Sequence, residues 1–314
     1  MRIGVLCNSI LAIPAIQLMQ NNKLLVAIGV PDVVVDDTPE LENFFTSTNI
    51  QASKFDSKGF ANGVKRWISN NNIDVVFVIT FPWKIPTHIL SIPKLGFFNF
   101  HFALLPAYRG ASPVFWQIRN GELFGGLTIH RMDSGWDTGA IAHIHKVAML
   151  PGETFGMHNR RIGWETLQGV AGFIQKLMLL GNAIPLSAQN PDEAHYYSRP
   201  SAKDIAIDWA TMTASEIFNL VNACNPWNKG AYTMCGNSVF KIVQLSIKEQ
   251  LNVYNQQLIP GSVINCSVNK TIEVITVDNK VVVVEVISID EGIFTADFLV
   301  KQGLKENQLL VKPF

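Results

Sequence analysis

Apolar and polar positions alternate along the first part of the chain in blocks that have the lengths of strands and helices. Residues 2–7, 24–30 and 74–80 are short, almost continuously apolar runs. Runs of this kind are typical of strands that are buried on both faces of a parallel sheet. Between the second and third runs, residues 59–70 repeat their apolar positions at helical spacing. The alternation therefore predicts βαβ units.

The same pattern continues to residue 181. Residues 97–102 and 127–132 predict a fourth and a fifth strand, and residues 165–181 carry an apolar stripe that ends at Gly181. Glycine commonly follows the last turn of a helix, so this helix is expected to end there. We expect an α/β domain, built on a Rossmann-like parallel sheet, over residues 1–181.

The remainder of the chain has a different pattern. Residues 182–202 contain three prolines and several polar residues, which is typical of a linker. A helical stretch at 213–223 is followed by short β-rich runs at residues 231–233, 239–245, 262–266, 272–277, 281–289 and 294–299. Short strands broken by Gly, Asn, Asp or Pro predict a small OB-like β-barrel domain over residues 203–314.

Composition and charge narrow the class of protein. Apolar residues make up 48% of the chain and charged residues 16%, which favours an ordered globular protein. Lys plus Arg equal Asp plus Glu at 25 each, so no overall positive field attracts a polyanion. No apolar run reaches the roughly 18 residues that span a bilayer, and polar residues interrupt the stretch 3–19, so neither a membrane segment nor a signal peptide is expected.

The spacing of the cysteines indicates neither a metal site nor a redox site. All four are widely separated and none forms a CxxC pair, so neither a zinc site nor a redox motif is expected. We expect reduced thiols in a cytoplasmic protein.

The polar residues that could carry chemistry lie in two segments. Asn99 and His101 stand two positions apart at the end of the fourth predicted strand, and this spacing puts both side chains on one face. Asp137 lies in a glycine-rich loop, residues 133–141, that follows the fifth strand. Ligands of parallel sheets bind at the carboxyl ends of the strands. Each residue by itself is more often a hydrogen-bonded strand end or a turn cap than a catalytic group, whereas their combination indicates a catalytic site.

The combination also resembles a known family. The pattern comprises Asn99, His101, Leu104, Leu105, Pro106, Tyr108, Arg109 and Gly110, followed by Asp137, Thr138 and Gly139. It resembles the methionyl-tRNA formyltransferases, within the wider group of enzymes that use 10-formyltetrahydrofolate. The resemblance continues at residues 207–209, 225–227 and 230–232 and so covers essentially the full length.

The resemblance implies transfer of a formyl group from the folate to an amine. Attack of the amine on the formyl carbon produces a tetrahedral intermediate with negative charge on oxygen, which needs hydrogen-bond donors. Asn99 and a protonated His101 are the donors that this chemistry would use. Asp137 would orient the imidazole, favour its charged form and help to remove the proton of the amine. The reaction needs no metal.

The resemblance also assigns the surrounding residues. By analogy with the pterin pocket of the family, the folate is expected beside Phe81, Trp83, Lys84, Ile85 and Pro86, with Leu105, Gly135 and Trp136 completing the pocket. The motif residues Tyr108, Arg109 and Gly110 are assigned to the acceptor. Arg109 is equally consistent with orienting the loop through a structural pair.

Three functions remain open at this point. The first is formylation of a small amine, such as an amino-sugar nucleotide or a biosynthetic intermediate; the second is formylation of methionyl-tRNA; the third is a non-catalytic folate-binding homologue. The oligomeric state cannot be read from the sequence.

Local charge favours the small amine. Enzymes that bind tRNA contact its phosphates with clustered Lys and Arg. Residues 31–55 instead contain more acidic than basic residues. The acidic residues are Asp32, Asp36, Asp37, Glu40 and Glu42, and the basic residue is Lys54. The predicted linker and its surroundings are also more acidic than basic, with Asp192, Glu193, Asp204, Asp208 and Glu216 against Arg199, Lys203 and Lys229. A basic patch that combines Lys65, Arg66, Arg160 and Arg161 is the arrangement that would favour tRNA.

Overall fold

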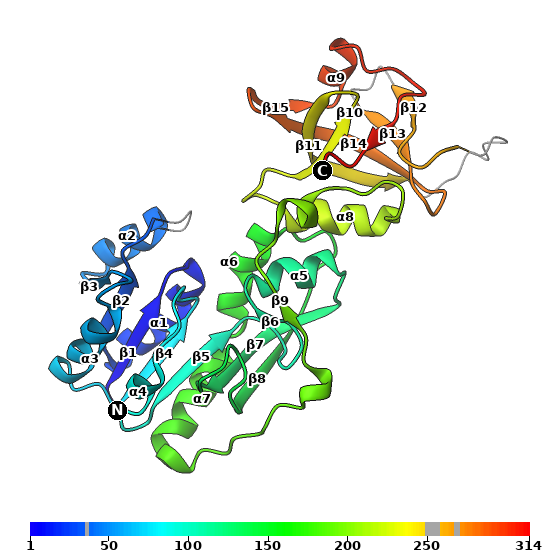
Figure 1. Cartoon of the computed structure of the whole chain (residues 1–314). Coiled ribbons are helices and arrows are strands. Elements are labelled where there is room, and N and C mark those ends of the chain that lie inside the picture. Colours follow the sequence, from blue (N-terminus) through cyan, green and yellow to red (C-terminus); the bar gives the residue numbers. More distant parts are fainter. Residues whose placement is uncertain (35–37, 249–257, 267–270) are drawn as a thin grey trace. The chain divides into compact units, whose positions relative to one another are not determined.

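The computed structural model describes residues 1–34, 38–248, 258–266 and 271–314, which form two compact units (Figure 1). Unit 1 comprises Met1–Pro113, Phe124–Ala148 and His158–Ser198, and unit 2 comprises Val114–Leu123, Met149–Met157 and Arg199–Phe314. Most of the segment that the sequence predicts as a linker therefore belongs to unit 1. The domain boundaries at residues 181 and 202 stay a prediction.

A seven-stranded sheet forms the centre of unit 1, in the order β3-β2-β1-β4-β5-β7-β8. Its strands are β1 (Ile3–Cys7), β2 (Leu25–Pro31), β3 (Ala52–Phe55), β4 (Val75–Ile79), β5 (Phe97–His101), β7 (Phe124–Arg131) and β8 (Ile141–Ala148). The first five are parallel, and β7 and β8 extend the sheet in antiparallel pairing. The predicted Rossmann-like α/β sheet is confirmed, with an antiparallel edge in place of a fully parallel sheet.

Helices pack on this sheet because their apolar faces need cover. They are α1 (Ile13–Asn21), α2 (Thr38–Ser47), α3 (Phe60–Asn70), α4 (Thr87–Leu90) and α7 (Leu167–Leu180). The first residues of α6 (Phe155–Glu165) belong to unit 2 and the rest to unit 1. The rings of Phe77, Phe98 and Phe100 from β4 and β5 pack on Phe173 of α7, with centroid distances of 5.0 to 6.3 Å across the group. Gly181 ends α7 with a φ of 55°, as its position predicts.

Unit 2 is built on an antiparallel sheet in the order β12-β13-β14-β11-β10-β16, with β15 beside β14. Its elements are α5 (Pro113–Arg119), α8 (Ala214–Ala223), β10 (Ala231–Cys235), β11 (Ser238–Lys248), β12 (Val263–Cys266), β13 (Ile272–Ile275), β14 (Val281–Ile289), β15 (Gly292–Thr295), α9 (Asp297–Lys301) and β16 (Leu310–Val311). Trp209 is only 2% exposed and donates its indole N–H to Thr233. The predicted β-rich second domain is confirmed.

One predicted strand in unit 2 is wrong. Residues 294–299 were expected to form a single strand, but β15 ends at Thr295 and α9 begins at Asp297. The Thr295 hydroxyl donates to the Asp297 carboxylate, and Asp297 pairs with Lys301 one turn later. These local polar contacts favour a helical turn over the β propensity of the apolar residues. Among the described residues, no helix is both long and apolar enough to cross a membrane.

Candidate functional site

The polar cluster of unit 1 forms where β5 ends. Asn99 and His101 share one face of β5, and the strand lies between β4 and β7 in the sheet. His101 is 6% exposed. The Asp137 side chain, which is 11% exposed, approaches both residues from the loop between β7 and β8. The structure thus brings together the three residues that the sequence assigned to catalysis.

Asp137 accepts hydrogen bonds through both carboxylate oxygens. Oδ1 accepts from Asn99 Nδ2 at 3.1 Å and lies 3.7 Å from His101 Nδ1. Oδ2 accepts from the backbone N–H of Gly110 at 2.9 Å. Burial by itself would raise the pKa of the Asp137 carboxyl, but His101, His130 and the Gly110 N–H lower it to about 2. Asp137 is therefore a carboxylate at every pH near neutrality.

The orientation of His101 is set by a backbone carbonyl. Its Nε2 lies 2.8 Å from the carbonyl oxygen of Tyr108, which can only accept, so Nε2 carries a hydrogen. Nδ1 then faces Asp137. Burial lowers the pKa of the imidazole more than the Asp137 carboxylate and the Tyr108 carbonyl raise it. The neutral imidazole is favoured, in place of the charged form expected from the sequence, because desolvation outweighs the single nearby carboxylate.

His130 is a member of the cluster that the sequence analysis did not select. It lies opposite Asn99 in the antiparallel pairing of β5 and β7 and is 2% exposed. Its Nε2 is 3.1 Å from Asn99 Nδ2, and its Nδ1 is 3.3 Å from the carbonyl of Arg131. Nε2 also lies 3.5 Å from Asp137 Oδ1; with the ring hydrogen on Nδ1, toward the carbonyl, Nε2 accepts from Asn99. The two hydrogens of Asn99 Nδ2 are thus shared between Asp137 and His130.

The residues assigned to the folate pocket fall into two groups. Phe81, Ile85 and Leu105 are 9%, 1% and 4% exposed and pack mostly into the interior. Trp136 is 47% exposed, and the Lys84 ammonium lies 5.9 Å from its ring centroid.

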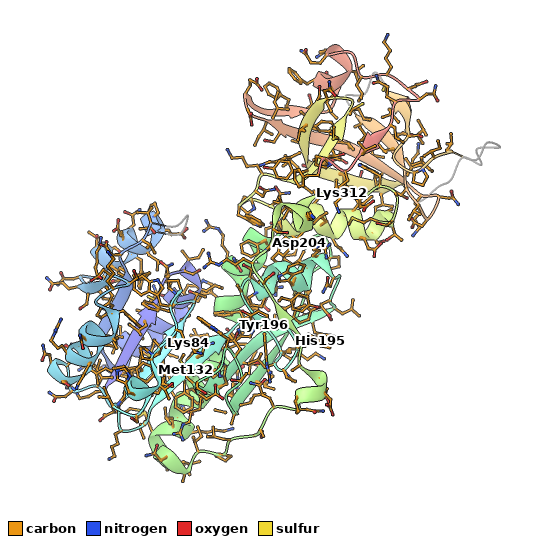
Figure 2. All side chains as sticks on the ribbon, viewed as in Figure 1. Lys84, Met132, His195, Tyr196, Asp204 and Lys312 are labelled. Atoms are coloured by element: carbon orange, nitrogen blue, oxygen red, sulfur yellow. The ribbon has the colours of Figure 1, made fainter. Side chains whose placement is uncertain are left out.

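Lys84 projects from the loop between β4 and α4 (Figure 2). In the same loop, Trp83 packs edge-on against Phe60 and Phe81, and Pro86 caps α4. Gly135 donates its N–H to Asp133 within the Asp137 loop. The loops after β4 and β7 are therefore linked through Lys84 and Trp136.

The residues assigned to the acceptor have structural partners. The Tyr108 ring stacks on Tyr197 at 5.0 Å with the planes 10° apart. Arg109 and Gly110 form the short strand β6, which pairs with β9 (Tyr196–Tyr197). Gly110 has a φ of 97°, and a Cβ there would lie 2.2 Å from the carbonyl oxygen of Tyr197. Glycine is required at this position because both its conformation and its surroundings exclude a side chain.

Arg109 does not face the reacting cluster directly. Its guanidinium donates twice to the side-chain oxygen of Gln189, whose amide nitrogen donates to the carbonyls of Asp137 and Gly139. The sequence analysis missed Gln189 because it lies within the predicted linker and no local pattern distinguishes it. His130 could have been found, since it follows Thr128 at strand spacing in a predicted strand.

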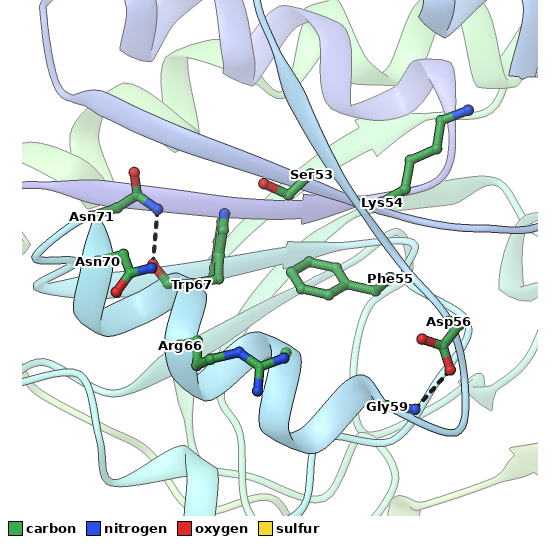
Figure 3. Close-up of a pocket in the computed structure, with 10 residues that line it drawn as sticks. Ser53, Lys54, Phe55, Asp56, Gly59, Arg66, Trp67, Asn70 and Asn71 are labelled. Atoms are coloured by element: carbon green, nitrogen blue, oxygen red, sulfur yellow. Dashed lines mark hydrogen bonds between the residues drawn. The ribbon is translucent and has the colours of Figure 1, made fainter.

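Two hollows are present elsewhere in unit 1. One, of about 380 Å³, lies between β3 and α3, where Phe55 and Trp67 face each other and Asp56 accepts from the N–H of Gly59 (Figure 3). The other, of about 160 Å³, is lined by the start of α1 and the 3-10 turn before it, by Glu40 of α2 and by α6. Neither is lined by the residues of the polar cluster. The candidate site is therefore identified by its buried titratable side chains and not by the size of a cavity.

Comparisons with known proteins identify the family to which the chain belongs. Residues 18–170 match the family model described as formyl transferase, and residues 200–299 match the model of the formyl transferase C-terminal domain. The chain is 33% identical to a methionyl-tRNA formyltransferase of Halothermothrix orenii over 242 residues, covering 76% of this chain and 74% of that protein. It is 36% identical to a methionyl-tRNA formyltransferase of Clostridioides difficile, covering 70% and 68% respectively.

Two solved structures have a similar fold. One is an N-formyltransferase from Helicobacter canadensis in complex with folinic acid and dTDP-3-aminofucose, with a TM-score of 0.65, 18% identity, and coverage of 90% of this chain and 98% of that one. The other is a methionyl-tRNA formyltransferase from Clostridium thermocellum, with a TM-score of 0.55, 16% identity, and coverage of 79% and 94%. At these identities the likeness concerns the fold alone.

Proposed function

This chain belongs to the formyl transferase family, and on that premise we propose that it transfers the formyl group of 10-formyltetrahydrofolate to a primary amine. The observation that carries the proposal is the cluster of Asn99, His101 and Asp137, in which a carboxylate with a pKa of about 2 faces a neutral imidazole across 3.7 Å. In such a pair the imidazole can accept a proton, and the carboxylate supplies the negative charge that stabilises the imidazolium.

The neutral His101 is the proton acceptor in this mechanism. Its Nε2–H is held by the carbonyl of Tyr108, so only Nδ1 has a free lone pair. As the amine attacks the formyl carbon, a new N–C bond forms and the amine proton passes to Nδ1. The Asp137 carboxylate stabilises the imidazolium that results. The intermediate collapses when the C=O bond re-forms and the bond to N10 of the folate breaks; N10 takes up the proton held on Nδ1, which returns His101 to its neutral form.

Asn99 supplies a donor for the negative oxygen of the intermediate. In the free protein both hydrogens of its amide are taken, by Asp137 and by His130. One of them must turn toward the oxyanion during the reaction, and the bond that is given up lowers the net stabilisation. The contact with His130 Nε2 at 3.1 Å holds the Asn99 amide in place until that happens.

The folate is proposed to lie against the linked loops after β4 and β7. Trp136 offers an exposed aromatic face and Lys84 a cation beside it, while Trp83 is half-buried in the same loop. A pterin ring and a carboxylate-bearing tail have the chemistry that these groups bind. The buried Phe81 and Ile85 support the loop from beneath.

Methionyl-tRNA is the acceptor that the sequence relatives favour. Both curated relatives described above carry that name, at identities of 33% and 36%. The charge distribution that favours a small amine in the sequence is weaker evidence, because it counts charges along the chain and not over a folded surface that binds phosphates.

A small amine remains a second candidate acceptor because ion pairs neutralise basic residues that could otherwise bind tRNA phosphates. Two of the cations that could have formed a basic patch are paired with carboxylates: Arg160 with Glu40 at 3.1 Å, and Arg161 with Glu165 at 2.6 Å. Lys54 is paired with Glu42. Asp36 and Asp37, which contributed to the acidic count, lie outside the described residues. These pairs reduce the positive charge available to phosphates.

One experiment separates the two acceptors. The purified protein is incubated with 10-formyltetrahydrofolate and either methionyl-tRNA or amino-sugar nucleotides, and products are identified by mass spectrometry. Formylation of methionyl-tRNA that weakens steeply with salt supports the tRNA acceptor. Formylation of an amino sugar alone supports the second candidate. Absence of formyl transfer to every amine tested, with intact folded protein, would overturn the proposed function.

A further inference from the structure

Gln189 makes a complete set of hydrogen bonds beside the proposed site. Its side-chain oxygen accepts from Nε and from a terminal nitrogen of Arg109, at 3.0 and 2.7 Å. Its amide nitrogen donates to the carbonyl oxygens of Asp137 and Gly139, each at 2.8 Å. All four positions of the amide are therefore used, and only an amide supplies two acceptor positions and two donors at this geometry.

The backbone that Gln189 holds is in an uncommon conformation. Asp137 has a φ of 55°, in the left-handed region that residues with a Cβ rarely adopt. Such a conformation persists only where the surroundings enforce it. Bonds to the carbonyls on either side of Thr138, at Asp137 and Gly139, supply that enforcement. The side chain of Asp137 is fixed separately by the N–H of Gly110.

The same chain segment also supports His101. Ser187 exchanges two backbone hydrogen bonds with Ile141, and Tyr196 and Tyr197 pair with β6. Tyr197 stacks on Tyr108, whose carbonyl holds the imidazole of His101. Residues 187–197 thus contact both the backbone of the Asp137 loop and the ring of Tyr108, the residue whose carbonyl orients His101.

We infer that Gln189, braced by Arg109, is a positioning residue that holds the Asp137 carboxylate at its working distance from His101. The inference rests on the proposed function. It also gives Arg109 a role different from binding an acceptor anion, because the guanidinium is directed at Gln189. We call the hydrogen bonds of Gln189 to Arg109 and to the Asp137 loop the brace. Because displacement of a reacting group by about 1 Å can lower a rate by about 10²-fold, loss of the brace should lower turnover and leave substrate affinity unchanged.

Three variants test the brace by kinetics. Gln189→Leu removes all four bonds, and Gln189→Glu keeps an acceptor for Arg109 but loses both donors to the Asp137 loop. Both are expected to lower kcat by about 10²-fold and to leave the KM values for folate and acceptor nearly unchanged. Arg109→Met leaves Gln189 in place and is expected to lower kcat by less. Gln20→Leu is the matched control, since Gln20 donates to a backbone carbonyl remote from the site.

The double variant Arg109→Met with Gln189→Leu separates the two roles of Arg109. Residues that act as one unit give non-additive losses, so the double variant should be no slower than Gln189→Leu alone. An acceptor-binding Arg109 would instead raise the acceptor KM, and its effect would multiply with that of Gln189→Leu. Multiplicative losses, or a raised acceptor KM with unchanged kcat, would overturn the inference.

A second measurement is independent of activity. Because Asp137 accepts from the N–H of Gly110, loosening of the loop exposes that amide to hydrogen exchange. Gln189→Leu should speed exchange in residues 108–111 and leave exchange in α3 unchanged. Unaltered exchange at Gly110 would refute the brace even in a fully active enzyme. If the wild-type protein transferred no formyl group, the exchange result would still decide whether Gln189 holds the loop.

Discussion

Replacing Asp137 by Asn removes one negative charge and changes the side-chain volume very little. In the proposed mechanism His101 becomes an imidazolium with Nδ1 3.7 Å from Asp137. Two unit charges about 4 Å apart attract by about 4 kcal/mol at an effective dielectric constant of about 20. With an exposure of 11%, the carboxylate is only weakly screened by solvent. Since about 1.4 kcal/mol corresponds to a factor of ten, kcat should fall by about 10³-fold.

The assay follows formylated product by mass spectrometry under saturating folate and acceptor. The KM for the folate should stay close to the wild-type value, because the charge on His101 develops only after binding. Asp133→Asn is the matched control in the same loop. Asp133 accepts from Gly135 and Thr138, and Asn keeps an acceptor there, so turnover should change by no more than about twofold.

The charge state of Asp137 also constrains the pH profile of the rate. The pKa of Asp137 is about 2, so no titration of this carboxylate should appear in the rate between about pH 5 and pH 9. Turnover of Asp137→Asn above about a tenth of the wild-type value would refute the charge argument. So would a loss confined to KM, since that would make Asp137 a binding group and not a support for the imidazolium.

Three further predictions follow from the same contacts. His130→Ala leaves one hydrogen of the Asn99 amide unpaired and should lower kcat by about tenfold, a smaller loss than that of Asp137→Asn. A larger loss of kcat than that of Asp137→Asn would contradict the assigned roles. Gly110→Ala places a Cβ 2.2 Å from the carbonyl of Tyr197 and should lower the unfolding free energy by at least about 1–3 kcal/mol in denaturant titrations, whereas near-wild-type stability would show that the backbone there adapts easily. Burial lowers the pKa values of His101 and His143 below their usual 6.5, so below about pH 6.5 the unfolded chain binds more protons than the folded one. The melting temperature should therefore be lower at about pH 5.5 than at about pH 7.5. An equal melting temperature at both pH values would contradict this.

Much of the fold is predictable because burial on both faces leaves a strong mark on a strand. Every residue of β1 and β4 is buried, and both appear in the sequence as unbroken apolar runs. The edge strands β3 and β8 were missed for the converse reason. Ser53 and Lys54 of β3 are exposed, and β8 alternates apolar residues with His143, His145 and Lys146. A strand that is paired on one side only need not be apolar, so its hydrophobic signal is weak.

By itself the sequence determined the identities and local spacing of the reacting groups. Asn99 and His101 share a face because side chains alternate along a strand, and a glycine-rich turn supplies Asp137. His130 enters the cluster only through the pairing register of β5 and β7, and Gln189 only because a segment 50 residues beyond the Asp137 loop returns to it. Tertiary structure also decided that the pKa of His101 is lowered, since desolvation depends on every neighbour that excludes water. Spacing along the chain fixes short-range geometry, whereas burial and long-range contacts arise only when distant segments pack together.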